Sequence, residues 1–310
     1  MGTIVVAALI TMDGCATSSP GKQTRQEVQA MATESEKLPF GLDKSQVGLA
    51  TVQYVSRQSA QVQRTIRIQG NGAVQIEASA LDGRPAAGGL NDQQVSPTVA
   101  LRLLDMIEGE NFFGLDDFIL PPEKVEVRRI IEVALPGRDK KIVTYDAPNS
   151  SEFERIAGAV ALVAAIASRG GTQPSREVAD ASLQYAYLSS KPGAGDQEIH
   201  LGGDGNVKLL FRKTANDPAA EVREMSGGQN TFAALWDLFE QERFLTLPDY
   251  QSTGRARVLR SIKFSRGSQT RELYAEGIDD PAFERLAGAI KLAAGILLPE
   301  ALNQRFFPNL

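Results

Sequence analysis

The chain has 310 residues, of which 42% are hydrophobic and 23% charged, a composition typical of a soluble globular protein of about two domains. Its formal net charge of −5 argues against a general nucleic-acid binder, because such proteins are usually basic. The single cysteine, Cys15, excludes an internal disulfide. Together with the single histidine, His200, it supplies too few ligands for a thiolate zinc site.

An apolar run precedes Cys15 near the start of the sequence. It spans residues 4–10 (IVVAALI), and Gly14-Cys15 is followed by small polar residues. This order is similar to a bacterial lipoprotein signal, although no Lys or Arg precedes the run and Asp13 replaces a small uncharged residue. The pattern predicts a signal segment over residues 1–15, lipidation of Cys15 and a membrane anchor through it. The alternative is a disordered start with an incidental cysteine.

Self-similarity is the strongest pattern in the rest of the chain. Phe153–Val160 (FERIAGAV) returns as Phe283–Ile290 (FERLAGAI), and Asn71-Gly72 returns as Asp204-Gly205 at a nearly constant offset. The sequence therefore predicts a polar tether over 16–46, a first repeat over 47–169, a linker over 170–178, a second repeat over 179–297 and a C-terminal tail over 298–310.

Each repeat is predicted to have the order βββ-α-ββ-α. In the first repeat the strands are expected at Thr51–Ser56, Arg67–Gln69, Val74–Glu77, Val127–Leu135 and Lys141–Tyr145, with helices beginning after Ser96 and Ser150. In the second they are expected at Ser182–Leu188, Glu198–Leu201, Val207–Phe211, Val258–Ser265 and Arg271–Ala275, with helices capped by Asn230 and Asp280. Because hairpins dominate, the expected fold class is α+β, with a mainly antiparallel sheet in each repeat and helices packed on one face.

Local details refine this expectation. Asn71-Gly72 and Asp204-Gly205 predict type I′ turns, in which both turn residues have positive φ. The final helices carry Gly158 and Gly288, whose recurrence predicts a close approach of helix to sheet. The connections Asp82–Val95 and Lys213–Gln229 are expected to be long loops, and they differ between the repeats.

A short aromatic motif recurs in both repeats. Phe112–Phe118 (FFGLDDF) and Phe244–Tyr250 (FLTLPDY) share the pattern Phe-x-x-Leu-x-Asp-aromatic, after an Asn/Asp-Gly hairpin and a helix and before two strands and a helix. This order resembles an uncharacterised family of bacterial domains, a domain of unknown function found in secreted proteins and lipoproteins, here as a tandem repeat. The resemblance implies a fold and an exported location, and it brings no activity with it.

Candidate chemistry is sparse along the chain. Gly202–Gly205 looks like a phosphate-binding loop, but a strand follows where that loop needs a helix, so a hairpin turn is favoured. His200 reads as a surface strand histidine, since no nucleophile accompanies it. Asp116-Asp117 and Asp249 could form a carboxylate pair for glycoside chemistry or a calcium site, although Asp at such loops usually stabilises turns. We therefore predict no catalytic residues, no cofactor and no metal.

Positive charge gathers on one hairpin of the second repeat. The candidate surface for an anionic partner is Arg255, Arg257, Arg260, Lys263, Arg266 and Arg271, with the solvated side of an antiparallel sheet as the alternative interpretation. We expect a non-enzymatic binding or assembly module, exported to the bacterial cell envelope in the periplasm or at the outer membrane. Its partners would be the membrane, through Cys15, and another envelope protein or a polysaccharide. The alternatives are a periplasmic enzyme inhibitor that uses the strand–helix loops, and a carboxylate-dependent cell-wall hydrolase.

Overall fold

A computed structural model describes residues 38–57, 62–80, 85–119, 128–145, 150–170, 175–189, 197–211, 221–249, 258–275 and 280–298. Cys15, the signal segment over 1–15, most of the tether and nearly all of the C-terminal tail lie outside these residues. Lipidation of Cys15 therefore stays a prediction.

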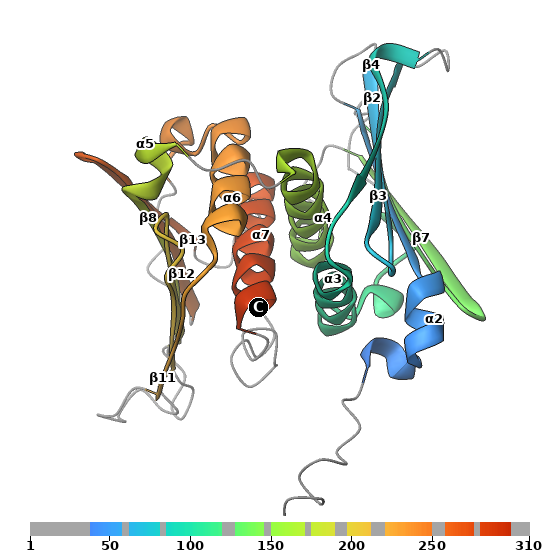
Figure 1. Cartoon of the computed structure of the whole chain (residues 1–310), viewed down its shortest axis with the longest axis horizontal. Coiled ribbons are helices and arrows are strands. Elements are labelled where there is room, and N and C mark those ends of the chain that lie inside the picture. Colours follow the sequence, from blue (N-terminus) through green and yellow to red (C-terminus); the bar gives the residue numbers. More distant parts are fainter. Residues whose placement is uncertain are drawn as a thin grey trace, which may run out of the picture. The chain divides into compact units, whose positions relative to one another are not determined.

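The described part contains helices and two sheets, and it confirms the α+β fold class (Figure 1). The first sheet has the order β4-β3-β2-β1-β6-β7-β5 and the second β11-β10-β9-β8-β12-β13. Neighbouring strands are antiparallel, apart from the parallel pair β5 and β7. The first sheet's strands are β1 (Thr51–Arg57), β2 (Val62–Gln69), β3 (Ala73–Ala80), β4 (Pro85–Gln94), β5 (Phe118–Ile119), β6 (Arg128–Leu135) and β7 (Arg138–Tyr145). Those of the second are β8 (Ala181–Ser189), β9 (Gln197–Gly202), β10 (Val207–Phe211), β11 (Glu221–Met225), β12 (Val258–Arg266) and β13 (Gln269–Ala275).

The two long connections were expected to be loops, and this expectation is wrong. Strand β4 occupies most of the first connection, and β11 occupies residues 221–225 of the second, whose residues 213–220 lie outside the described part. Each strand pairs with the preceding strand at the edge of its sheet. Residues 85–89 (PAAGG) have low strand propensity, so local sequence gives no sign of β4. The strand forms because its backbone groups satisfy those of β3. Before each α–ββ–α segment the chain therefore has four strands and not three.

The described helices are α2 (Lys44–Leu49), α3 (Pro97–Gly109), α4 (Ser151–Arg169), α5 (Arg176–Ala179), α6 (Gln229–Gln241) and α7 (Pro281–Leu297), with 3-10 turns η1 (Pro39–Gly41), η2 (Phe112–Gly114) and η3 (Phe244–Thr246). Helices α3, α4, α6 and α7 lie on the inner faces of the sheets, whereas the short helices α2 and α5 lie near the ends of the sheets (Figure 1). The predicted caps Ser96, Ser150 and Asp280 are confirmed, since each side chain accepts a hydrogen bond from the first turn. Asn230 lies within α6, and Gly228 is the N-cap there. Among the described helices none is long and apolar enough to cross a membrane.

The hairpin turns after β2 and β9 differ from type I′. Only the glycines have positive φ, +91° at both Gly72 and Gly205, whereas Asn71 and Asp204 do not. Instead the side chain of Asp204 accepts a hydrogen bond from the backbone N–H of Asn206 at 3.0 Å. In the same way the side chain of Asn71 accepts one from the backbone N–H of Ala73 at 3.0 Å. This Asx turn explains the Asn and Asp without left-handed backbone.

Helices α4 and α7 cross at two glycines. A Cβ at Gly158 would lie 2.7 Å from the Cα of Arg285, and a Cβ at Gly288 would lie 2.5 Å from the Cα of Arg155. The expected close approach is therefore of helix to helix and not of helix to sheet. Glycine is needed at both positions because the two backbones touch there.

A chain of buried charges runs through this crossing. Arg155 donates to Glu110 at 2.7 Å and, across the crossing, to Glu284 at 2.9 Å. Glu284 also accepts from Arg260 at 2.9 Å, and Lys291 donates to Glu110 at 2.8 Å. All five side chains are at most 7% exposed. Each carboxylate thus faces two cations, which is the condition under which buried charge is tolerated.

A second chain of charges follows the same plan with the two halves exchanged. Arg285 donates to Glu242 at 2.7 Å and across the crossing to Glu154 at 2.9 Å. Glu154 also accepts from Arg129 at 2.7 Å. Arg155 and Arg285 are thus each shared between a carboxylate of their own half and one of the other. The arrangement fixes the register of the helices and occupies their polar groups in structural contacts.

Candidate functional site

Because the helices cover the inner faces of the sheets, the outer faces carry the accessible polar side chains. Strand β9 shows the alternation: Ile199 and Leu201 are buried, while Glu198 and His200 are half-buried on the opposite side. Strand pairing places His200 beside Gln184 of β8 and Lys208 of β10, and Gln184 beside Lys263 of β12. Lys263, Gln184, His200 and Lys208 therefore form a row across four strands of the second sheet, which we call the outer-face row.

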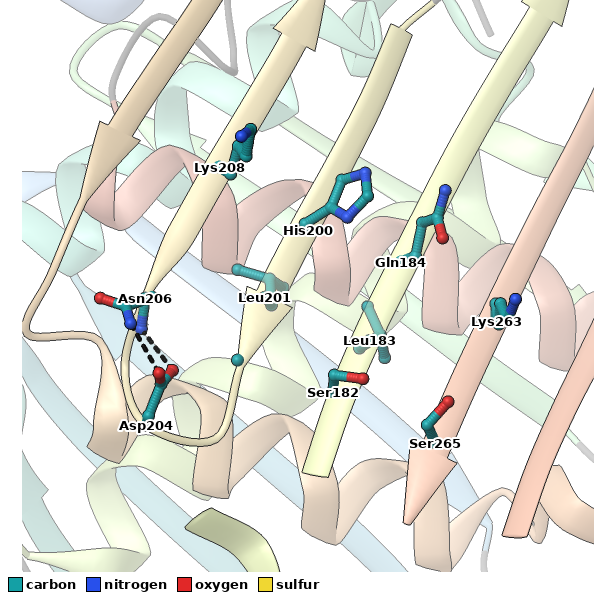
Figure 2. Close-up of a pocket in the computed structure, with 11 residues that line it drawn as sticks. Ser182, Leu183, Gln184, His200, Leu201, Asp204, Asn206, Lys208, Lys263 and Ser265 are labelled. Carbon is teal, nitrogen blue, oxygen red and sulfur yellow. Dashed lines mark hydrogen bonds between the residues drawn. The ribbon is translucent and has the colours of Figure 1, made fainter. Parts of the chain in front are cut away.

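The outer-face row crosses a shallow depression of about 310 Å³. Figure 2 shows the row side by side on neighbouring strands, with Ser182 and Ser265 below it and Asp204 and Asn206 at the turn. Hydroxyl and amide groups line the floor, and the amines of two lysines stand on either side of His200. Such a surface offers many hydrogen-bond donors to a polar ligand, together with positive charge.

An arginine lies across the corresponding row of the first sheet. There Glu132, Gln53, Arg67 and Gln75 pair in the same way as Lys263, Gln184, His200 and Lys208. Arg67 donates to Gln53 at 2.8 Å and to Gln75 at 3.4 Å, so its long side chain lies across the row. His200 is shorter, and it leaves the second sheet hollow at this place.

Hydrogen bonds inside the depression leave part of it open to a ligand. Glu198 Oε2 lies 2.9 Å from His200 Nε2 and accepts from Gln184 at 3.1 Å. At the turn, Asn206 donates to Asp204 at 2.6 Å. Within the part of the chain that the structure describes, Lys263 makes no ion pair. Its amine is therefore available to an anionic group.

The expected anionic-partner surface does not form as a single patch. Arg260 points inward and is 5% exposed in its ion pair with Glu284, so it does not belong to a surface. Arg266 contacts Glu240 and lies 5.1 Å above the ring of Trp236. Of the predicted residues that the structure describes, only Lys263 lines the depression. Arg271 donates to Asp249 at 2.9 Å, whereas Arg255 and Arg257 lie outside the described residues.

The remaining candidates are separated in space and occupied. Asp117 forms an ion pair with Lys140 at 2.8 Å, and Asp249 forms one with Arg271 on the other sheet, so the structure does not bring these carboxylates together. Gly202–Gly205 is the hairpin turn before β10, as expected. Throughout the described segments no group of three or more His, Cys, Asp or Glu side chains is placed to hold a metal ion.

Most of the depression escapes sequence reasoning. Strand alternation around Asp204-Gly205 is enough to pair His200 with Lys208, so that contact could have been predicted. Gln184, Ser182 and Ser265 carry no motif of their own. They join the site only because β8 lies between β9 and β12, and local pattern does not reveal strand order.

No protein-family model matches the sequence, and no curated protein matches it. Among solved structures, the chain is similar to the Helicobacter pylori beta clamp bound to a DNA ligase peptide, with 9% identity, a TM-score of 0.12 and coverage of 81% of this chain and 65% of that one. It is also similar to a DNA polymerase III beta chain from Streptococcus pneumoniae TIGR4, with 9% identity, a TM-score of 0.11 and coverage of 81% and 62%. The chain thus spans less than two thirds of these structures. Similarity this slight carries no argument about activity or partners.

Proposed function

We propose that this protein is a non-enzymatic binding module of the bacterial cell envelope, made of two diverged copies of one ββββ-α-ββ-α unit, and that the outer-face row binds an acidic polysaccharide. The observation that carries the proposal is the contrast between the sheets: the long side chain of Arg67 lies across the row in the first, whereas a depression crosses the equivalent row in the second. The matching strand orders and the recurring FER-x-x-G helices support the duplication.

The buried charges support a binding role over a catalytic one. The charged side chains at the crossing of α4 and α7 are paired with one another, and those around Arg155 are buried. These ion pairs join the two halves of the chain. This leaves the outer faces of the sheets as the surfaces for contact with other molecules.

The ligand class follows from the lining of the depression. Ser182, Ser265, Gln184 and Asn206 can exchange hydrogen bonds with sugar hydroxyls, which both donate and accept. Lys263 and Lys208 attract carboxylates. A shallow surface suits a chain that passes across it, because an enclosed pocket would admit only a small ligand. A saccharide that contains uronic acid residues combines these properties.

The test is calorimetric titration of the protein with a short uronic-acid oligosaccharide, with a neutral glucose oligosaccharide as the comparison. Lys263→Glu gives the second sheet the residue that the first has at Glu132, and we expect it to weaken binding about tenfold. Lys141→Glu makes the same charge change on the first sheet and should leave the affinity unchanged. Equal losses in both variants, or no binding of the acidic oligosaccharide, would contradict the proposal.

The location in the envelope rests on the residues before the described part. The apolar run and Gly14-Cys15 support export and lipidation. Mass spectrometry of the protein's N-terminus after expression in a bacterium tests this directly. A diacylated Cys15 is expected, and an N-terminus that retains residues 1–14 with an unmodified thiol would contradict it.

A further inference from the structure

An apolar pocket of about 240 Å³ opens where α6 ends, away from the outer-face row. Phe239, Phe244 and Phe264 lie in its wall, each at most 2% exposed, with ring centroids 4.9 Å apart for Phe239 and Phe244. Leu245 is half-buried beside them, and Arg243 is exposed at the rim. Binding of an apolar side chain to an aromatic wall of this kind is favourable, because it removes apolar surface from water.

The first half of the chain shows what covers the corresponding place. There η1 packs against α3, and the ring of Phe40 meets the ring of Phe113 edge to face at 5.5 Å. Phe113 follows α3 and Phe112 as Leu245 follows α6 and Phe244. Phe40 has φ of +57°, so residues 38–42 (LPFGL) make a tight turn that presents the ring.

The second half cannot supply such a cover from the same position. Helices α2 and α5 correspond, because the carbonyl of Val47 lies against Gly70 and that of Val178 lies against Gly203. The residues that precede Val178 at the distance of the LPFGL segment are 169–173 (RGGTQ). None of these has an apolar side chain.

We propose that the pocket receives an aromatic side chain from a partner polypeptide, presented on a short apolar turn like residues 38–42 and followed by an acidic residue. Arg243 gives the reason for the acidic residue. It is exposed beside the pocket and makes no ion pair within the described residues. A carboxylate next to the aromatic residue would pair with this guanidinium.

The test uses a capped synthetic peptide with the sequence of residues 37–43 (KLPFGLD), added to the full chain and followed by NMR. This peptide carries the turn, the aromatic ring and the carboxylate. We expect saturable shifts at Arg243, Leu245 and Thr246. A peptide with the Phe40→Ala change should bind about tenfold more weakly or worse. A peptide with the Asp43→Asn change should bind the parent chain a few-fold more weakly than the unchanged peptide does. The two peptides should bind the Arg243→Ala variant with equal affinity, because the guanidinium that would pair with Asp43 is then absent.

Four results would overturn the proposal. The first is the absence of any shift, and the second is a shift pattern centred on Phe113 and not on Leu245. The third is binding that appears only after residues 299–310 are removed, because the chain's own tail would then be the occupant. The fourth is equal binding of the Phe and Ala peptides, which would exclude an aromatic side chain as the anchor.

Discussion

The helix crossing gives the most demanding prediction, the effect of Gly158→Ala and Gly288→Ala. In most helices this change stabilises by about 1 kcal/mol, because alanine loses less backbone freedom on folding. Here a Cβ at Gly158 would lie 2.6 Å from the carbonyl carbon of Arg285, whereas carbon atoms in contact stay about 3.5–4.0 Å apart. The helices must therefore separate by about 1 Å, because both contacting groups are backbone.

The cost of that separation has two parts. Overpacking costs about 1–3 kcal/mol, and the ion pairs of 2.9 Å across the crossing, Arg155 with Glu284 and Arg285 with Glu154, are stretched as well. After the gain from helix propensity is subtracted, we expect each variant to lose roughly 2–4 kcal/mol. The melting temperature should then fall by about 5–15 °C.

The assay is urea unfolding followed by circular dichroism, supported by calorimetry. Gly109→Ala is the matched control, because nothing lies within 4 Å of its Cβ at the end of α3, and it should be neutral or slightly stabilising. The double variant of Gly158 and Gly288 should lose less than the sum of the single losses, because one separation relieves both clashes. Single variants as stable as the parent protein would refute the close crossing.

Three further predictions concern buried charge and backbone strain. Arg155→Met leaves Glu110 and Glu284 each without one partner, so the free energy of unfolding in urea should fall by about 3 kcal/mol; a loss under about 1 kcal/mol would show that the network is dispensable. Burial alone would raise the pKa of Glu110, but Lys291 and Arg155 hold that pKa below its ordinary value. A carboxyl group whose pKa is lower in the folded than in the unfolded protein stabilises the fold above the unfolded pKa of about 4.3, and this stabilisation is lost as the pH falls through the folded pKa. At pH values below about 4 the urea midpoint should therefore decrease, and it should decrease less steeply in Glu110→Gln. Arg243 has φ of +53°, a left-handed conformation that a Cβ disfavours. Arg243→Gly should therefore raise the free energy of unfolding by about 1 kcal/mol, measured as a higher thermal midpoint, whereas Arg243→Ala keeps the Cβ and should not.

Local chemistry explains which parts of the fold could be predicted. Ser96 and Asp280 cap their helices, and each precedes a proline at the first helical position, so both helix starts follow from the sequence. Strand alternation predicted most of the paired strands. The edge strand β4 could not be predicted, because PAAGG favours a loop and only the open edge of β3 makes it a strand.

The charge network could not be predicted for a different reason. Arg155 and Glu284 are 129 residues apart, and each lies in a helix whose charged residues look like an ordinary solvated face. The repeated FER-x-x-G motif was the available signal, since Glu and Arg recurred beside the same glycine. Its meaning depended on knowing that the second helix was the partner of the first.

Binding at the outer-face row can be followed residue by residue by NMR of the full chain with the uronic-acid oligosaccharide. We expect saturable shifts confined to β8, β9, β10 and β12, with Lys263 and His200 among the affected residues, and an oligosaccharide that is recovered unchanged. Shifts on the first sheet, or conversion of the oligosaccharide into smaller products, would contradict it.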